Sequence, residues 1–404
     1  MDFNDTPEEA RFRQEVRTWL EENKIAPWQP GESEIAWSKR WQMIKYKGGW
    51  GCPTWPKEWG GRDASTIETM IFTEEEGKVI SGPDTQGMNF GIVAPTLIAY
   101  MTEADKQRYL PKIASGEERW CQLFSEPAAG SDLAGLITRS VRDGDDWIIN
   151  GQKIWTSGAQ HADFGILVTR SDPDALKHKG LTYFYVDMRS PGIDIRPIKQ
   201  INGQKNFNEV YLTNVRIPDS QRLGAVGEGW KVALHTLMNE RASSGRSRTR
   251  QSFDALAMMN LAKETELEDG TALEDRAIRE KIADYYVQET GLLYTVARTR
   301  TALSKGNTPG PENSIGKLVA AKKTQDMASD CINMLEMSGA SMDPDLSPGR
   351  GFLQTSYLSA PGSRIAAGTD EILLNIISER VLGLPQEVRV DKEKPFNQIP
   401  RGPS

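Results

Sequence analysis

SEPAAGSD, at residues 125–132, is the stretch that decides the fold when it is read together with WTSG at residues 155–158. The first is a turn of small residues with a hydroxyl near each end. The second places an indole beside two hydroxyls at the end of a strand-like run. Small turn residues let the backbone approach a ligand closely. The hydroxyls can hydrogen-bond to heteroatoms of a flat ring, and the indole can cover the face of that ring.

Composition narrows the class of protein. The chain has 404 residues, enough for two or three domains, and its 38% hydrophobic and 26% charged residues are typical of a soluble globular protein. A formal net charge of −7 with no dominant basic stripe argues against a nucleic-acid binder. The acidic N-terminus does not resemble a signal or transit peptide, and no apolar run reaches the length of a membrane span.

Cysteine and histidine usage argues against a metal centre. There are three cysteines, Cys52, Cys121 and Cys331, and three histidines, His161, His178 and His235. The cysteines lack metal-like spacing, so we expect buried small hydrophobes in a reduced cytoplasm. No pattern groups the histidines, so we expect no metal site.

Helical patterns begin at Thr6-Pro7-Glu8-Glu9, where a capping residue precedes proline at the first helical position. They recur to about Gly116. Pro111 disfavours helical geometry at the residue before it, so we expect the last of these helices to end or kink at Leu110.

The pattern changes to strands from Trp120. Apolar runs at 147–149 and 153–155 flank Asn150-Gly151, which predicts a hairpin turn. Further strand-like runs cover residues 164–169, 182–186, 193–195 and 209–212.

Helical patterns return from Gly227. A long helix is expected to open there, with others over 275–304, 315–337 and 369–383, and a proline and glycine break at 307–311. The fold class is therefore α+β: an N-terminal helical domain at 1–119, a middle β-barrel-like domain at 120–226 and a C-terminal helical bundle at 227–385. Residues 386–404 read as a polar, mobile tail.

The motifs at 125–132 and 155–158 resemble the flavin-binding signature of the acyl-CoA dehydrogenase family, and the resemblance extends from about residue 6 to Pro385. It implies bound FAD and an acyl-CoA substrate. By resemblance, the flavin contacts fall on Gln122, Phe124, Ser125, Trp155, Ser157, Thr369 and Glu371, and the substrate contacts on Ser131, Arg241 and Ala367. Arg241 is the first residue of an arginine cluster. The alternative interpretation is that this cluster forms a solvated helix face and does not contact the substrate.

Glu240 is the candidate base. Many family members place a glutamate directly before the Gly-Thr of the C-terminal motif, but Ala367 stands there in this chain. A minority place it on the helix after the β domain, before an arginine, and Glu240-Arg241 matches that pattern. Thr236, Ser243 and Ser244 share its helix face and, being small and polar, are expected to leave room for substrate. Surface pairing of Glu240 is the alternative. The rivals are Asp370 and Glu371, which a helix N-terminus favours in any case.

The resemblance implies α,β-dehydrogenation of an acyl-CoA thioester, in fatty acid or lipid catabolism. Glu240 would take the α-proton while the β-hydride passes to the flavin. A backbone N–H near Ala367 and a flavin hydroxyl would polarise the carbonyl. Electrons would leave to an electron-transfer flavoprotein.

Two departures from the family pattern, at residues 265–269 and 336–340, fall where subunits share the cofactor. We therefore expect a homo- or hetero-oligomer, a tetramer by resemblance. Three alternatives stay open: an oxidase on the same scaffold, a subunit of a two-chain enzyme for bulky steroid- or terpenoid-like substrates, and a non-catalytic partner subunit.

Overall fold

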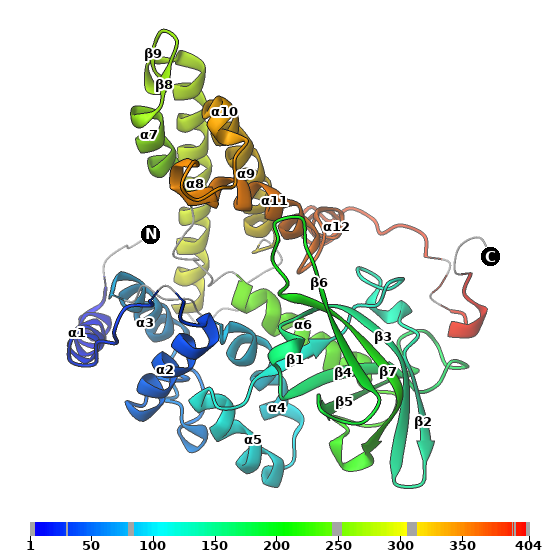
Figure 1. Ribbon diagram of the computed structural model, residues 1–404. Helices are drawn as coiled ribbons and strands as arrows, with labels where there is room; N and C mark the ends of the chain where they lie inside the picture. Colours follow the sequence, from blue (N-terminus) through cyan, green and yellow to red (C-terminus); the bar gives the residue numbers. More distant parts are fainter. Residues whose placement is uncertain are drawn as a thin grey trace. The chain divides into compact units, whose positions relative to one another are not determined.

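The computed structural model describes residues 5–29, 31–79, 85–244, 253–304, 313–389, 391 and 393–400. They form two compact units. The sheet unit holds the described residues within 7–199, 205–246 and 387–404, and the helical unit those within 1–6, 200–204 and 247–386. Figure 1 shows that the sheet unit carries the large sheet with α1 to α6, and the helical unit α7 to α12.

Three helices at the start of the sheet unit enclose a tryptophan-rich core. They are α1 (Pro7–Glu22), α2 (Glu34–Lys47) and α3 (Thr66–Val79), and α1 begins where the capping pattern predicts. Trp37, Trp41 and Trp50 are each at most 4% exposed. The rings of Trp50 and Phe72 stack with centroids 5.2 Å apart, so aromatic packing holds α3 against this core.

The next helices are α4 (Ala94–Tyr100) and α5 (Glu103–Ser115), and α5 continues through Pro111 to a left-handed Gly116. The helix therefore does not end at Leu110, and the predicted alternative, a kink there, stays a prediction. Leu110 and Ile113 are fully buried on either side of the proline. Burying two such side chains contributes roughly 3–6 kcal/mol, which offsets the cost of about 3 kcal/mol for proline inside a helix.

A seven-stranded, curled sheet follows, as the predicted α+β class requires. Its strands are β1 (Trp120–Leu123), β2 (Arg139–Asp143), β3 (Asp146–Ser157), β4 (Phe164–Arg170), β5 (Leu181–Asp187), β6 (Ile193–Ile198) and β7 (Phe207–Pro218). Their order is β1-β4-β2-β3-β7-β6, with β5 paired to β4. The β1–β4 pair is parallel, and the extended pairs β2–β3, β3–β7, β4–β5 and β6–β7 are antiparallel.

Alternation along the central strands divides their side chains between two cores. Ile166 and Tyr183 join the core that includes residues of α4, α5 and α6 (Gly229–Ser244), whereas Leu167 and Phe184 join the core on the other face. Both faces of β4 and β5 are thus covered, and α6 is fixed against the sheet.

Asn150-Gly151 does not form the predicted hairpin turn. β3 runs straight through it, and the chain reverses earlier, at Gly144-Asp145, between the paired Asp143 and Asp146. A Cβ on Gly151 would lie 2.4 Å from Thr138 Oγ1, and the β3–β7 register shifts at this point. Gly151 therefore lets its backbone lie close to Thr138 at a bulge, and it is not part of a turn.

The helical unit contains α7 (Ala255–Glu264), α8 (Arg276–Ser304), α9 (Asn313–Met334), α10 (Glu336–Gly339), α11 (Phe352–Ile365) and α12 (Asp370–Arg380), with a small hairpin of β8 (Glu266–Leu267) and β9 (Gly270–Thr271). α8 confirms the helix that was predicted over residues 275–304. The helix predicted over 315–337 is instead divided, because Glu336 has a φ of 47°. α12 begins at its Thr369 cap as predicted and ends three residues before Gly383. The predicted break at 307–311 lies outside the described residues.

The polar segment after residue 386 is not a mobile tail over its described part. Phe396 is 3% exposed and lies under the guanidinium of Arg170, with the guanidinium carbon 3.4 Å from the ring centroid. One buried aromatic side chain anchors an otherwise polar sequence. The domain boundaries at residues 119, 226 and 385 remain predictions.

Candidate functional site

The turn after β1 holds the first group of predicted site residues. Gln122 lies on β1 and is partly exposed, Phe124 is 5% exposed, and Ser125 is partly exposed where the strand gives way to the turn. Glu126 and Ala129 exchange backbone hydrogen bonds of 2.9 and 3.0 Å. This closes the turn and leaves Ser131 exposed beyond it.

Trp155 lies in a strained bulge of β3. The β3–β7 register shifts between Lys153 and Thr156, and Trp155 takes a φ of 59°. Such a conformation costs about 1–3 kcal/mol and is concentrated at functional sites. Its consequence here is that the Trp155 indole is turned outward and is 55% exposed, with its edge toward the Phe207 ring.

The structure brings these two segments together. The backbone N–H of Ile154 donates to the carbonyl of Ser125 at 2.9 Å. Gln122, Phe124, Ser125, Trp155 and Ser157 therefore lie on adjoining segments of the sheet unit. Within the described residues, no hydrogen bond engages the side chains of Gln122, Ser125 or Ser157. They remain available to a ligand.

A buried ion pair that sequence reasoning missed fixes this arrangement. Lys153 Nζ donates to the Phe124 carbonyl at 3.0 Å and to Glu126 Oε1 at 2.9 Å, and its side chain is fully buried. Glu126 also accepts from the backbone N–H groups of Ile137 and Thr138 at 2.7 and 2.9 Å.

Burial and the neighbouring positive charge have opposing effects on the pKa of Glu126. Burial raises the pKa of Glu126, but the Lys153 ammonium and the hydrogen bonds to the carboxylate hold that pKa below its ordinary value. Burial also lowers the pKa of Lys153, and the Glu126 carboxylate opposes that effect. The available sequence signal was a lysine at an inward position of an apolar strand.

Glu240 lies near the end of α6 and is partly exposed. One turn earlier, Thr236 is fully buried, and its hydroxyl is 3.0 Å from Tyr183 Oη and 2.9 Å from Thr96 Oγ1. Thr236 thus ties α6 to β5 and α4. The room for substrate on this helix face stays a prediction, and the side chains of Ser243 and Ser244 lie outside the described residues. The side chain of Arg241 lies outside the described residues.

The remaining predicted residues belong to the helical unit. Ala367 has a φ of 54°, and Lys317 Nζ donates to the Gly368 carbonyl at 2.5 Å. The Thr369 hydroxyl accepts from the N–H of Ile372 at 3.3 Å as the cap of α12. Glu371 is exposed in the first turn of that helix.

The rival base Asp370 has a structural partner. It is 8% exposed and accepts from Arg364 Nε at 2.6 Å, so its charge is already engaged. Glu371, the second rival, is exposed in the first turn of α12, and the assignment of the base to Glu240 stays a prediction.

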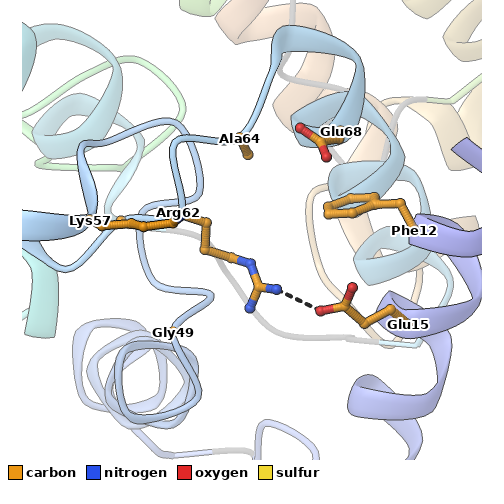
Figure 2. A pocket seen from close by; sticks show the side chains of 8 residues that line it. Phe12, Glu15, Gly49, Lys57, Arg62, Ala64 and Glu68 are labelled. Carbon is orange, nitrogen blue, oxygen red and sulfur yellow. Dashed lines mark hydrogen bonds and ion pairs between the residues drawn. The ribbon is translucent and has the colours of Figure 1, made fainter. Parts of the chain in front are cut away.

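Other sites are less promising. A cleft of about 440 Å³ lies between α1 and the segment before α3, and in it Arg62 donates to Glu15 at 2.5 Å. Figure 2 shows the side chains that line it. The cleft contains none of the predicted site residues.

In the described ranges, no group of three or more His, Cys, Asp or Glu side chains could hold a metal ion. All three cysteines are buried, as predicted. No described helix is long and apolar enough to span a bilayer.

Comparison with known proteins places the chain in a family. Acyl-CoA dehydrogenase IpdE1 of Mycobacterium tuberculosis is 35% identical over 390 residues, which cover 94% of this chain and 98% of that protein. The chain belongs to the acyl-CoA dehydrogenase family. Models of the family's N-terminal, middle and C-terminal domains match residues 6–117, 121–215 and 227–382.

Other family members give the same result. Acyl-CoA dehydrogenase FadE34 of Mycobacterium tuberculosis is 38% identical over 336 residues, 83% of this chain but 44% of that protein's length. The ChsE4-ChsE5 complex of Mycobacterium tuberculosis superposes with a TM-score of 0.78 at 26% identity, covering 96% of this chain and all of the other. The Tcur3481-Tcur3483 steroid ACAD gives the same TM-score, the same sequence identity and the same coverage of both chains. The protein is therefore an oxidoreductase of a flavin-dependent family.

Proposed function

We propose that the protein oxidises an acyl-CoA thioester to the 2-enoyl-CoA, with FAD as its cofactor. The observation that carries this proposal is the strained Trp155 bulge, which presents an exposed indole beside the unengaged hydroxyls of Ser125 and Ser157. An aromatic face next to edge donors suits an isoalloxazine ring. When bound, FAD supplies the hydride acceptor.

The chain's own residues bind, orient and move a proton. Trp155, Gln122, Phe124, Ser125 and Ser157 would hold the isoalloxazine ring, with the indole of Trp155 toward its face. Thr369 and Glu371, at the N-terminus of α12, suit the pyrophosphate end of the cofactor. Ser131, Arg241 and Ala367 are assigned to the acyl-CoA. Each of these roles follows from the family motif.

Glu240 removes the α-proton in this proposal. A carboxylate acts as a base toward a weakly acidic carbon when it is held close to it and shielded from water, which raises its pKa. The anchoring of α6 through Thr236 supports the role, because it fixes the helix that carries Glu240.

Replacing Glu240 tests the assignment. The Glu240→Gln variant should bind flavin normally, whereas its anaerobic reduction by a thioester should slow by about 10²–10⁴-fold, the usual contribution of a general base. Glu228→Gln, an exposed glutamate just before α6, is the matched control. Stopped-flow absorbance of the flavin, with a mixed panel of acyl-CoA thioesters, gives both rates. Normal reduction of Glu240→Gln would show that another group is the base.

A bulky substrate and a two-chain assembly form the second candidate. Two structural neighbours support it: the ChsE4-ChsE5 complex and the Tcur3481-Tcur3483 steroid ACAD. Alanine at position 367, where many relatives carry a glutamate, also leaves space. Steroid thioesters therefore belong in the panel. Reoxidation by an electron-transfer flavoprotein rather than by air would separate a dehydrogenase from an oxidase.

A further inference from the structure

The segment that follows α12 packs back on the sheet unit. The match to the family's C-terminal domain model ends at residue 382, so all of this segment after residue 382 lies beyond it. Its described part is residues 381–389, Asp391 and residues 393–400, and Asp391 with residues 393–399 is called the strap below. The backbone N–H of Phe396 donates to the Ala175 carbonyl at 2.9 Å, and that of Asn397 to the Pro173 carbonyl at 3.0 Å. The strap thus lies along the loop between β4 and β5.

Phe396 connects the strap to a second loop through Arg170. The buried Arg170 guanidinium covers the Phe396 ring and donates to the carbonyls of Ala134 at 2.5 Å and Leu136 at 3.2 Å. Ala134 and Leu136 belong to the loop of residues 126–138, which contains Ser131. One arginine therefore contacts both the strap and the Ser131 loop.

Lys177 makes a second connection, closer to Ser131. Its ammonium lies 2.7 Å from Asp132 Oδ2 and 2.8 Å from Asp391 Oδ2, and its side chain is 7% exposed. Asp132 directly follows Ser131. The Lys177 ammonium thus links a strap carboxylate to the carboxylate beside the predicted substrate contact.

These links complete the anchoring of an exposed loop. Glu126 holds both ends of the loop, through its place at the start and its hydrogen bonds from Ile137 and Thr138. Ser131 and Asp132 lie between those ends and are exposed. Lys177 and Arg170 fix this middle part, and the strap contacts both of them.

We propose that the strap positions the Ser131 loop for acyl-CoA binding, with Asp391 and Phe396 as positioning residues. The substrate half of this inference rests on the proposed function. Loss of the strap should loosen residues 130–136 and weaken thioester binding without changing the flavin site at Trp155, because the bonds of Lys153 to Phe124 and Glu126 remain.

Hydrogen exchange of the full-length protein tests the mechanical half without any ligand. In Phe396→Ala, amide exchange of residues 130–136 should rise about tenfold, while that of β3 stays unchanged. Asp391→Asn should give a smaller rise, which Asp391→Glu reverses. Asp143→Asn, which alters an exposed aspartate paired with Arg216, is the matched control. Unchanged amide exchange over residues 130–136 in Phe396→Ala would contradict the proposal that the strap positions the Ser131 loop.

Steady-state kinetics test the substrate half. Both strap variants should raise KM for the thioester by about tenfold and leave kcat at saturation within twofold, because binding geometry changes while the base does not. An unchanged KM beside increased exchange would overturn the substrate role. A wild-type protein whose flavin no thioester reduces would contradict the proposed function instead, so the two failures are distinguishable.

Discussion

Lys153 donates to the Phe124 carbonyl and to the Glu126 carboxylate from inside the protein, so removing its ammonium would leave a buried carboxylate unpaired. Breaking a buried pair in this way costs about 3–5 kcal/mol. We expect Lys153→Met to lose roughly that much in urea unfolding. We also expect its apoprotein to bind FAD more weakly, as followed by flavin fluorescence.

Two variants make this test specific. Lys179→Met, at an exposed lysine, should stay within about 0.5 kcal/mol of the wild type. The double variant Lys153→Met, Glu126→Gln should recover part of the loss, because no unpaired charge remains. A Lys153→Met protein as stable as the wild type would contradict the structural role.

Single residues were predictable to different degrees. Trp155 and Ser125 can be proposed as flavin contacts from sequence, because the motif places an indole and hydroxyls in a recognisable order, and this role stays a prediction. Lys153 was not, because its partner Glu126 lies 27 residues away and only the fold brings them together. The restraint on Thr236 was missed for the same reason, since Thr96 is 140 residues distant.

At the scale of elements, Glu75 joins α3 to α1. Its carboxylate accepts from Arg13 at 2.7 Å and from Arg17 at 2.9 Å, and Lys78 adds a third bond at 2.7 Å. Burial raises the pKa of Glu75, but these hydrogen bonds outweigh it and lower the pKa to about 2. The ionised form is thus favoured by folding.

The lowered pKa of Glu75 determines how its contribution to stability changes with pH. A carboxylate with a lowered folded pKa stabilises the protein above its unfolded pKa and loses that contribution as the pH falls through the folded value. For Glu75 the window runs from about pH 4.5 to about pH 2. Glu75→Gln should lose about 2 kcal/mol at pH 7, as expected for hydrogen bonds to a charged group. It should also show a shallower fall across that window.

Urea-unfolding free energies measured from pH 7 to pH 2 provide the comparison, with Glu22→Gln on exposed α1 surface as the control. Parallel curves for Glu75→Gln and the wild type would mean that Glu75 is not held in its ionised form.

Local sequence signals failed at two places where contacts elsewhere in the fold outweighed them. Pro111 predicts a helix end, yet Leu110 and Ile113 keep α5 continuous. Asn150-Gly151 predicts a turn, yet the Asn150 side chain bonds to Asn214 across β3 and β7. In both cases the deciding contacts are distant in sequence.

At the scale of the whole molecule, the order of helical, β and helical parts followed from periodicity, because each part has its own repeating apolar pattern. The strap did not, because its composition is that of a disordered tail and one aromatic residue, Phe396, accounts for its docking. A single anchor leaves no periodic signal.

α8 carries an apolar stripe that predicts association. Tyr286, Val287, Leu293 and Tyr294 are spaced along one helical face and are each 48–67% exposed. Covering such side chains contributes roughly 1.5–3 kcal/mol for each that is fully buried.

We therefore expect light scattering to give a mass above the 45.0 kDa of one chain, for the protein alone or with a second chain. Val287→Asp should shift the protein toward a monomer, because a carboxylate would have to be buried unpaired in the interface. Val141→Asp, the same change at an exposed valine on β2, should leave the mass unaltered. An assembly that tolerates Val287→Asp would show that the α8 stripe is not the surface through which the chains associate.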